Sequence, residues 1–306
     1  MAKYLGKRLG MGLVTLLALM TITFFMMHLI PGSPFAGEMS KLPASVKETL
    51  IRKYMLDRPI GEQYLVYLRN VLHGDLGISL NRKGQSVVSI IARGLPYTAK
   101  LGFVAFCVAM VGGILLGTAA AFTKRAWMRT IISFVATIGV SVPGFLFALF
   151  FMYVFGVWLG VLPLIGLAGP ANYVMPALSL AIGPVAMISR LVKTSLTEEL
   201  RQDYMVLARA KGTSRIRVIF RHALKNALLP VITYAGPLLA TLLTGSFVVE
   251  TMFSIPGIGA EFVGSVSSRD YTMIMALTIL YGGMIIVVNM LTDILTALID
   301  PRVRLS

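Results

Sequence analysis

The chain has 306 residues, of which 57% are hydrophobic and 13% are charged, and its net charge is +15. A soluble domain is about a quarter charged, so this composition excludes an ordinary water-soluble protein and indicates an integral membrane protein. A basic protein that binds nucleic acid is also excluded, because such a protein would not carry these long apolar stretches. In a membrane protein the excess of cations is expected from contacts with the inner leaflet.

Six runs of the chain are apolar and long enough to cross the bilayer core, which takes about 20 residues of α-helix. Pro143 lies inside the third run, and Gly183–Pro184 interrupts the fourth. The pattern predicts an all-α, polytopic membrane protein with six transmembrane helices. The runs cover approximately residues 9–30, 97–122, 130–158, 173–192, 231–249 and 272–299.

The first run follows Lys3, Lys7 and Arg8, as the apolar core of a signal peptide would. It is too long for such a core, and the Pro31–Pro34 stretch after it is not a small-residue cleavage site. We therefore expect an uncleaved helix.

A mixed polar segment follows the first run, with helical patterns at about 44–55 and 61–73. The sequence thus divides into an N-terminal part with the first helix (1–30), a structured external region (31–95) and a membrane domain (96–306). On its pattern alone, the external region is expected to be a structured loop that covers the bundle.

The loop charges predict the orientation in the membrane. The short connection Lys124–Arg129 is basic and is expected in the cytoplasm, whereas Leu159–Asn172 contains no Lys or Arg and is expected outside. Both termini then lie in the cytoplasm. The 31–95 region carries many cations but would be external, because segments of that length translocate largely regardless of charge.

The segment Thr194–Pro230 is amphipathic and too polar to span a bilayer. Ser195 and Glu198 are spaced as a capping box, which predicts a new helix starting there. Gly212 is suited to end that helix in a left-handed conformation. The helix would present an apolar face of Leu196, Leu200, Tyr204 and Leu207.

A second helix would follow, with Arg217, Arg221 and Lys225 four residues apart on one basic stripe. We interpret the two helices as a surface on the inner face of the membrane that is offered to a soluble partner. The alternative is that these cations only anchor the topology.

Motifs for catalysis are not found in the sequence, which has no HExxH, no GxSxG and no phosphate-binding GxxxxGK[ST] loop. The chain is therefore not expected to be an enzyme or to bind ATP or a metal itself. An intramembrane protease using His28 and a serine stays a minor alternative, because no serine lies in a recognisable nucleophile turn.

Polar residues inside the apolar runs are candidates for a translocation pathway, since ionisable groups in a membrane are costly. Asn289, Asp293 and Thr296 share one face of the last run. They either face the pathway or a partner, or Asp293 lies near the cytoplasmic interface and pairs with cations such as Arg302.

The fifth run carries a small, polar patch of Thr241, Thr244 and Ser246, which either packs against another helix or lines the pore. After it, Pro256 and Gly257 permit a non-helical backbone, which is tolerable only where protein or a wet cavity covers it. We expect these two residues to form part of an outer gate.

The stretches DYMVLARAKG (203–212) and RHALKNALLP (221–230) resemble the cytoplasmic-loop signature of ABC importer permeases, in the form typical of the peptide and nickel family. Where the widest version of that motif has Glu-Ala-Ala, this sequence has Ala208-Arg209-Ala210. The stretches HGDLGISL, VVETMFSIPGIG and SRDY also resemble this family, in particular the oligopeptide permeases.

The resemblance implies that the 194–230 loop forms coupling helices that dock on an ATPase subunit. It carries over to Tyr204 and to a cluster of small and basic residues. We expect Ala208, Ala210 and Gly212 to set the docking geometry, with Glu198, Asp203, Arg209 and Lys211 as polar contacts.

The resemblance further implies a machine in the cytoplasmic membrane that imports oligopeptides. A second homologous permease completes the pore, two cytoplasmic ATPases hold ATP and Mg, and an extracellular or periplasmic binding protein delivers peptide. The same architecture could import dipeptides, nickel or glutathione. A stand-alone secondary transporter is a further alternative, but no internal repeat supports it.

Overall fold

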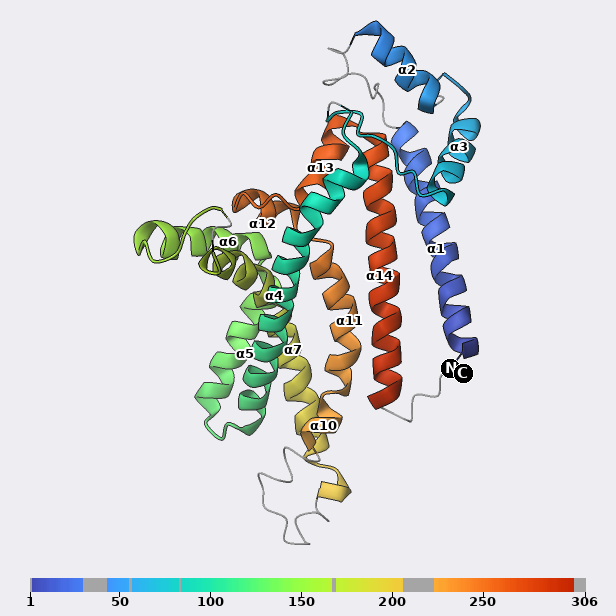
Figure 1. Cartoon of the computed structure of the whole chain (residues 1–306). Helices are drawn as coiled ribbons and strands as arrows, with labels where there is room; N and C mark the ends of the chain where they lie inside the picture. Colours follow the sequence, from blue (N-terminus) through green and yellow to red (C-terminus); the bar gives the residue numbers. More distant parts are fainter. Residues whose placement is uncertain are drawn as a thin grey trace. The chain divides into compact units, whose positions relative to one another are not determined.

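The structure, a computed structural model, describes residues 2–29, 43–54, 57–82, 84–166, 169–205 and 223–299. Within these ranges the elements are helical, and the one pairing of extended backbone is an antiparallel bridge between Ile78 and Ser86. In chain order (Figure 1) the helices are α1 (Ala2–Leu29), α2 (Ala44–Tyr54), α3 (Ile60–Leu72), α4 (Val87–Phe122), α5 (Ala126–Ser141), α6 (Gly144–Phe151), the π-helical turns η2 (Met152–Trp158), α7 (Ala171–Glu199), α10 (Leu224–Ala227), α11 (Leu229–Leu243), α12 (Phe247–Met252), α13 (Ile258–Ser268) and α14 (Tyr271–Ile299).

Five stretches of helix are long and apolar enough to cross a membrane, and they confirm the predicted all-α membrane fold. They are Gly6–Leu29, Val87–Phe122, Ala171–Glu199, Leu224–Leu243 and Tyr271–Leu298. Helix α4 begins ten residues before the predicted start at residue 97. Its 36 residues correspond to about 54 Å, well beyond the roughly 30 Å of a bilayer core.

The third apolar run, which we predicted as one span over residues 130–158, is not a single straight helix. Helix α5 ends at Ser141, and the pair formed by α5 and Gly144–Trp158 is bent by 106°. Val142 before Pro143 is extended, with φ −93° and ψ 127°. A proline disfavours the helical conformation of the preceding residue, and it clashes with that residue's Cβ.

The fourth run contains no interruption, which corrects a second prediction. Helix α7 continues through Pro184 to Glu199. Gly183 before this proline has no Cβ to clash with the ring, although the helix also continues through Pro176, which follows Met175. The predicted capping box is also wrong: Ser195 and Glu198 lie in the last turns of α7, because nothing in the sequence stops the helix before them.

The chain divides into two compact units, each described by itself. The first unit comprises Ala2–Thr98 and Pro256–Ile286. In its core, the second half of α1 packs against the first half of α14 and against tyrosines of α3. The buried side chains there are Met20, Phe24, Met27, Ile274 and Met275, and a second cluster joins Val87, Ile90, Ile91, Ile258, Met273, Ala276 and Leu277.

The second unit comprises Ala99–Ile255 and Val287–Ser306. Helices α4 and α7 approach closely in it, since a Cβ added to Gly113 would lie 2.5 Å from the Cβ of Ile188. Gly102 is equally close to the backbone of α11, at Leu242. Small residues allow such contacts between apolar helices, where van der Waals packing drives association.

Candidate functional site

The sequence-predicted coupling residues fall partly within the described structure. Glu198 lies in the last turn of α7, and Asp203 and Tyr204 follow in a short turn of helix. All three side chains are solvent-exposed. The small and basic residues Ala208, Arg209, Ala210, Lys211 and Gly212 lie outside the described residues. Their predicted role in docking therefore stays a prediction.

A hydrogen-bonded cluster joins the two ends of the predicted coupling loop. The Tyr204 hydroxyl donates to a carboxylate oxygen of Glu199, and the Asn226 amide donates to the Tyr204 oxygen at 3.2 Å and to that carboxylate at 3.5 Å. Burial, and then the hydrogen bond to Glu199, raise the pKa of Tyr204 above its usual value. The phenol is thus kept neutral and able to donate.

Apolar packing lies next to this cluster. Leu196 of α7 and Met205 are fully buried together with Ala223 and Ala227 at the start of the next helix. We had predicted Tyr204 on the apolar face; this prediction is wrong, because Tyr204 turns its hydroxyl to Glu199 and its neighbour Met205 enters the core instead. The end of α7 and the start of α10 therefore form one packed platform.

The candidate pathway residues of α11 belong to the second unit. The hydroxyls of Thr241 and Thr244 donate to backbone carbonyls one turn earlier, at 2.9 and 2.8 Å. Ser246 caps α12, since its Oγ accepts from the Val249 amide at 3.5 Å. Each threonine hydroxyl thus donates its hydrogen bond to the backbone of its own helix, so an apolar helix can carry these polar side chains.

Asn289 and Asp293 also lie in the second unit, one turn apart on α14. Asn289 Oδ1 and Asp293 Oδ2 are both buried. Between them in sequence, Thr292 meets α11, because a Cβ on Gly236 would lie 2.6 Å from the Cβ of Thr292. The two polar side chains are thus carried on a helix that packs closely against α11.

The predicted gate residues Pro256 and Gly257 lie in the first unit. As predicted, their backbone is not helical: Gly257 is extended and immediately precedes α13. The next residue is firmly held, since the Ile258 amide donates to Thr98 Oγ1 at 2.9 Å and its carbonyl accepts from the Tyr281 hydroxyl at 2.9 Å. The break is therefore a fixed turn.

Asp270 is a site residue that the sequence reasoning missed. Its carboxylate is 2% exposed and caps α14 by accepting the Met273 amide at 3.2 Å. It also accepts the hydroxyl of Thr272 and the amides of Leu80 and Asn81, at 2.9, 3.1 and 3.3 Å.

The same carboxylate accepts the hydroxyl of Ser79, which itself accepts the Arg82 amide at 2.9 Å. Ser79 and Asp270 belong to the stretches HGDLGISL and SRDY, which are about 190 residues apart in sequence. We name this contact between residues 78–82 and Asp270 the Asp270 latch. Only the family likeness of both stretches could have indicated it, since neither has a pattern that predicts the other.

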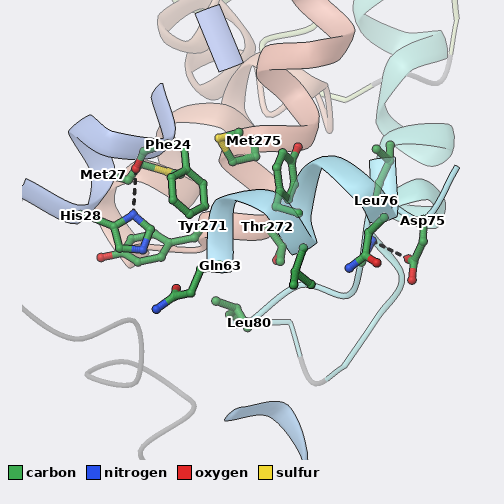
Figure 2. Close-up of a pocket in the computed structure, with 14 residues that line it drawn as sticks. Phe24, Met27, His28, Gln63, Asp75, Leu76, Leu80, Tyr271, Thr272 and Met275 are labelled. Atoms are coloured by element: carbon green, nitrogen blue, oxygen red, sulfur yellow. Dashed lines mark hydrogen bonds between the residues drawn. The ribbon is translucent and has the colours of Figure 1, made fainter. Parts of the chain in front are cut away.

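Next to the latch lies a small pocket of about 60 Å³. Figure 2 shows Phe24, Met27 and His28 from the end of α1 on one side, and Asp75 and Leu76 on the other. Tyr67 also lines it; burial raises the pKa of this phenol, and its oxygen has no hydrogen-bond partner among the described residues. The pocket is mainly apolar, and it is lined by His28, which the sequence suggested only as a minor protease candidate.

No three His, Cys, Asp or Glu side chains within the described ranges are grouped so that they could hold a metal ion.

Comparison with known proteins identifies the family. Residues 113–305 match the family described as the inner membrane component of binding-protein-dependent transport systems, and residues 1–102 match the N-terminal component of the same systems.

Full-length relatives agree with that match. The dipeptide transport system permease protein DppB of Lactococcus lactis subsp. cremoris is 42% identical over 305 residues, with 100% of both chains covered. The oligopeptide transport system permease protein OppB of Haemophilus influenzae is 43% identical over 307 residues, covering 99% of this chain and 100% of that protein.

A solved structure of the MetNI methionine ABC transporter, in an inward-facing conformation, shares the fold. Its TM-score is 0.57 at 19% identity, and the alignment covers 70% of this chain and 97% of that one. The relatives are permease subunits and not enzymes. The chain therefore belongs to the family of inner membrane components of binding-protein-dependent transport systems.

Proposed function

We propose that this chain is the permease subunit of an ATP-driven importer of peptides, forming half of the translocation pathway. Two observations support the proposal: the full-length likeness to a dipeptide and an oligopeptide permease, and the platform of Glu199, Tyr204 and Asn226 at the base of the predicted coupling loop. The first supports the cargo class, and the second supports a mechanical role for the loop.

The platform suits the transmission of force. Residues 206–222 leave and re-enter the described structure next to Met205 and Ala223, which are both fully buried in one cluster. A push on the loop is therefore passed to α7 and, through α10, to α11, because close-packed interiors transmit displacement. Helix α11 carries Thr241 and Thr244, so the loop is connected to a candidate pathway helix.

The complete importer contains subunits besides this chain. A second homologous permease completes the pore, and two cytoplasmic ATPases hold ATP and Mg and dock on the coupling loops. An extracellular or periplasmic binding protein delivers peptide to the external region. The chain itself carries no cofactor. It lies in the cytoplasmic membrane with both termini in the cytoplasm, as the basic connection Lys124–Arg129 supports.

The pathway assignment is also part of the proposal. Thr241, Thr244 and Ser246 line the route of the peptide, with Asn289 and Asp293 as further polar contacts, and Pro256–Gly257 forms part of the outer gate. The fixed turn at Gly257 supports a gate that moves as a rigid body. If Pro256→Ala and Gly257→Ala leave both peptide uptake and coupled ATP hydrolysis unchanged, the gate role is refuted.

The first test is purification of the tagged chain from native membranes. We expect ATPase subunits and a second permease in the eluate, with ATP hydrolysis stimulated by a peptide-loaded binding protein. Competition between dipeptides and longer peptides then defines the cargo. Recovery of the chain alone, even after mild crosslinking, would refute the proposal and favour a stand-alone transporter.

Coupling is tested separately with Gly212→Asp, which puts a bulky acid at the predicted docking surface. We expect normal insertion and complex abundance with loss of peptide-stimulated hydrolysis. The matched control is Gln202→Asp, which adds the same acid at an exposed position nearby. Normal uptake by a well-expressed Gly212→Asp variant would contradict the coupling role.

A further inference from the structure

A polar hollow and a large apolar groove meet on the surface formed by α5 and α7 of the second unit. Ile132, Ala136 and Ser189 line both of them. The hollow has a volume of about 90 Å³ and the groove one of about 620 Å³. A ligand that is charged at one end and apolar along its length would fit this combined surface.

The hollow is cationic. Arg190 and Lys193 of α7 line it, opposite the hydroxyls of Ser133 and Thr137 on α5. The Lys193 ammonium donates to Ser133 Oγ at 2.9 Å, which leaves the serine hydrogen and the other ammonium hydrogens to bind an acceptor. Among the residues that the structure describes, no carboxylate forms an ion pair with Arg190 or Lys193. The hollow therefore offers donors and positive charge to an anion.

The groove is apolar along its whole length and lies between four helices. Its lining from α4, α5, α6 and α7 is hydrocarbon except for Ser189 at the hollow. Leu116, Ile131 and Val135 are 41–56% exposed, so a substantial apolar surface is open there. Its volume falls within the roughly 300–1,000 Å³ of sites that bury a small ligand.

The hollow lies about two helical turns from the end of α5 that follows the basic connection. Helix α5 begins at Ala126, directly after the basic Lys124 and Arg125. Ser133 is seven residues into that helix, about 10 Å along its axis, and Lys193 lies a similar distance before the end of α7. The long cationic side chains can reach the interface from this depth. The basic connection places this end on the cytoplasmic side.

We propose that this surface binds an anionic phospholipid of the cytoplasmic leaflet. Arg190, Lys193 and the Ser133 hydroxyl hold the phosphate, and an acyl chain lies in the groove along α5 and α7. The complementary charge argues for this occupant over an apolar helix of a partner subunit, which would fill the groove but leave both cations without a counter-charge. Basic pockets between membrane helices on this side are suited to anionic headgroups.

The test uses the complete transporter complex, delipidated in detergent and titrated with phosphatidylglycerol, phosphatidylcholine or inorganic phosphate. Bound lipid is counted by native mass spectrometry. We expect saturable binding of phosphatidylglycerol that weakens at least about tenfold in the Arg190→Gln, Lys193→Gln double variant. Arg125→Gln, which removes an exposed cation outside the hollow, is the matched control and should change the affinity less than about twofold.

Further variants keep the test decisive if the double variant does not fold. Arg190→Lys with Lys193→Arg keeps both charges and should retain binding. Ala136→Phe, which fills the junction of hollow and groove, should abolish binding of the lipid.

Three results would overturn the proposal. The first is an affinity for phosphatidylcholine equal to that for phosphatidylglycerol. The second is stabilisation of the delipidated complex by inorganic phosphate alone. The third is an efficient crosslink to a partner subunit from Val135→Cys in a chain that lacks Cys107. None of these readouts depends on peptide transport, so this proposal and the proposed function fail independently.

Discussion

The Asp270 latch allows a quantitative prediction about the stability of the first unit. In Asp270→Ala the buried amides of Leu80 and Met273 lose their acceptor, and the part-buried amide of Asn81 keeps only Ser79 Oγ. A buried donor without a partner costs about 1–3 kcal/mol, and the loss of a helix cap costs about 1 kcal/mol. Allowing for partial solvation after the change, we expect the free energy of unfolding of the first unit to fall by about 3–5 kcal/mol.

The measurement is thermal unfolding of the purified complex, together with hydrogen exchange at residues 78–82. A loss of this size should lower the transition by about 6 °C or more and remove the protection of the Leu80 amide. Asp75→Ala is the matched control: it removes the same charge from the loop that contacts Asp270, but Asp75 is exposed and, among the described residues, accepts the Gly77 amide at 2.8 Å. Its cost should stay within about 1 kcal/mol.

Asp270→Asn distinguishes the roles of the two carboxylate oxygens. The amide oxygen can still cap α14 at Met273, but the new NH₂ group would face the amide of Asn81 and compete for the Ser79 oxygen. We expect a loss between those of Asp270→Ala and Asp75→Ala. If Asp270→Ala unfolds within about 2 °C of Asp75→Ala and residues 78–82 stay protected, the latch does not stabilise the protein as reasoned here.

Two further predictions concern the second unit. Gly102→Ala would place a methyl group 2.7 Å from the carbonyl carbon of Leu242 and force α4 away from α11, so the yield of folded complex should fall. The control Gly283→Ala, which has open space around it, should not change the yield. Tyr204→Phe removes the hydroxyl that joins both ends of the coupling loop and should lower peptide-stimulated ATP hydrolysis about fivefold, with Gln202→Ala as the unaffected control.

The sequence alone determined the helical spans, because a run of about 20 apolar residues is stable in a bilayer only as a helix whose backbone bonds are internal. It therefore predicted the last span, 272–299, to within one residue of α14, and the two helices of the external region nearly as well. The resemblance in the 203–230 stretches likewise identified the family from residues next to one another in the chain.

Predictions from local sequence patterns were wrong where two physical rules favoured different structures. The capping-box spacing at Ser195 gave no helix start, because α7 was already formed and a helix propagates more easily than it begins. Two similar proline motifs gave opposite results, a bend of 106° at Pro143 and a continuous helix at Pro184. The residue before the proline does not by itself decide the outcome, since Pro96 after Leu95 and Pro176 after Met175 also lie inside continuous helices.

Only the tertiary structure could decide which distant residues meet. Ser79 and Asp270 form the Asp270 latch across about 190 residues, and Ser133 and Lys193 form the cationic hollow across 60. Each partner alone looks like an ordinary loop or helix residue. Hydrophobic periodicity specifies which face of an element is apolar, but contacts between polar side chains depend on how those faces pack, and no local pattern encodes that.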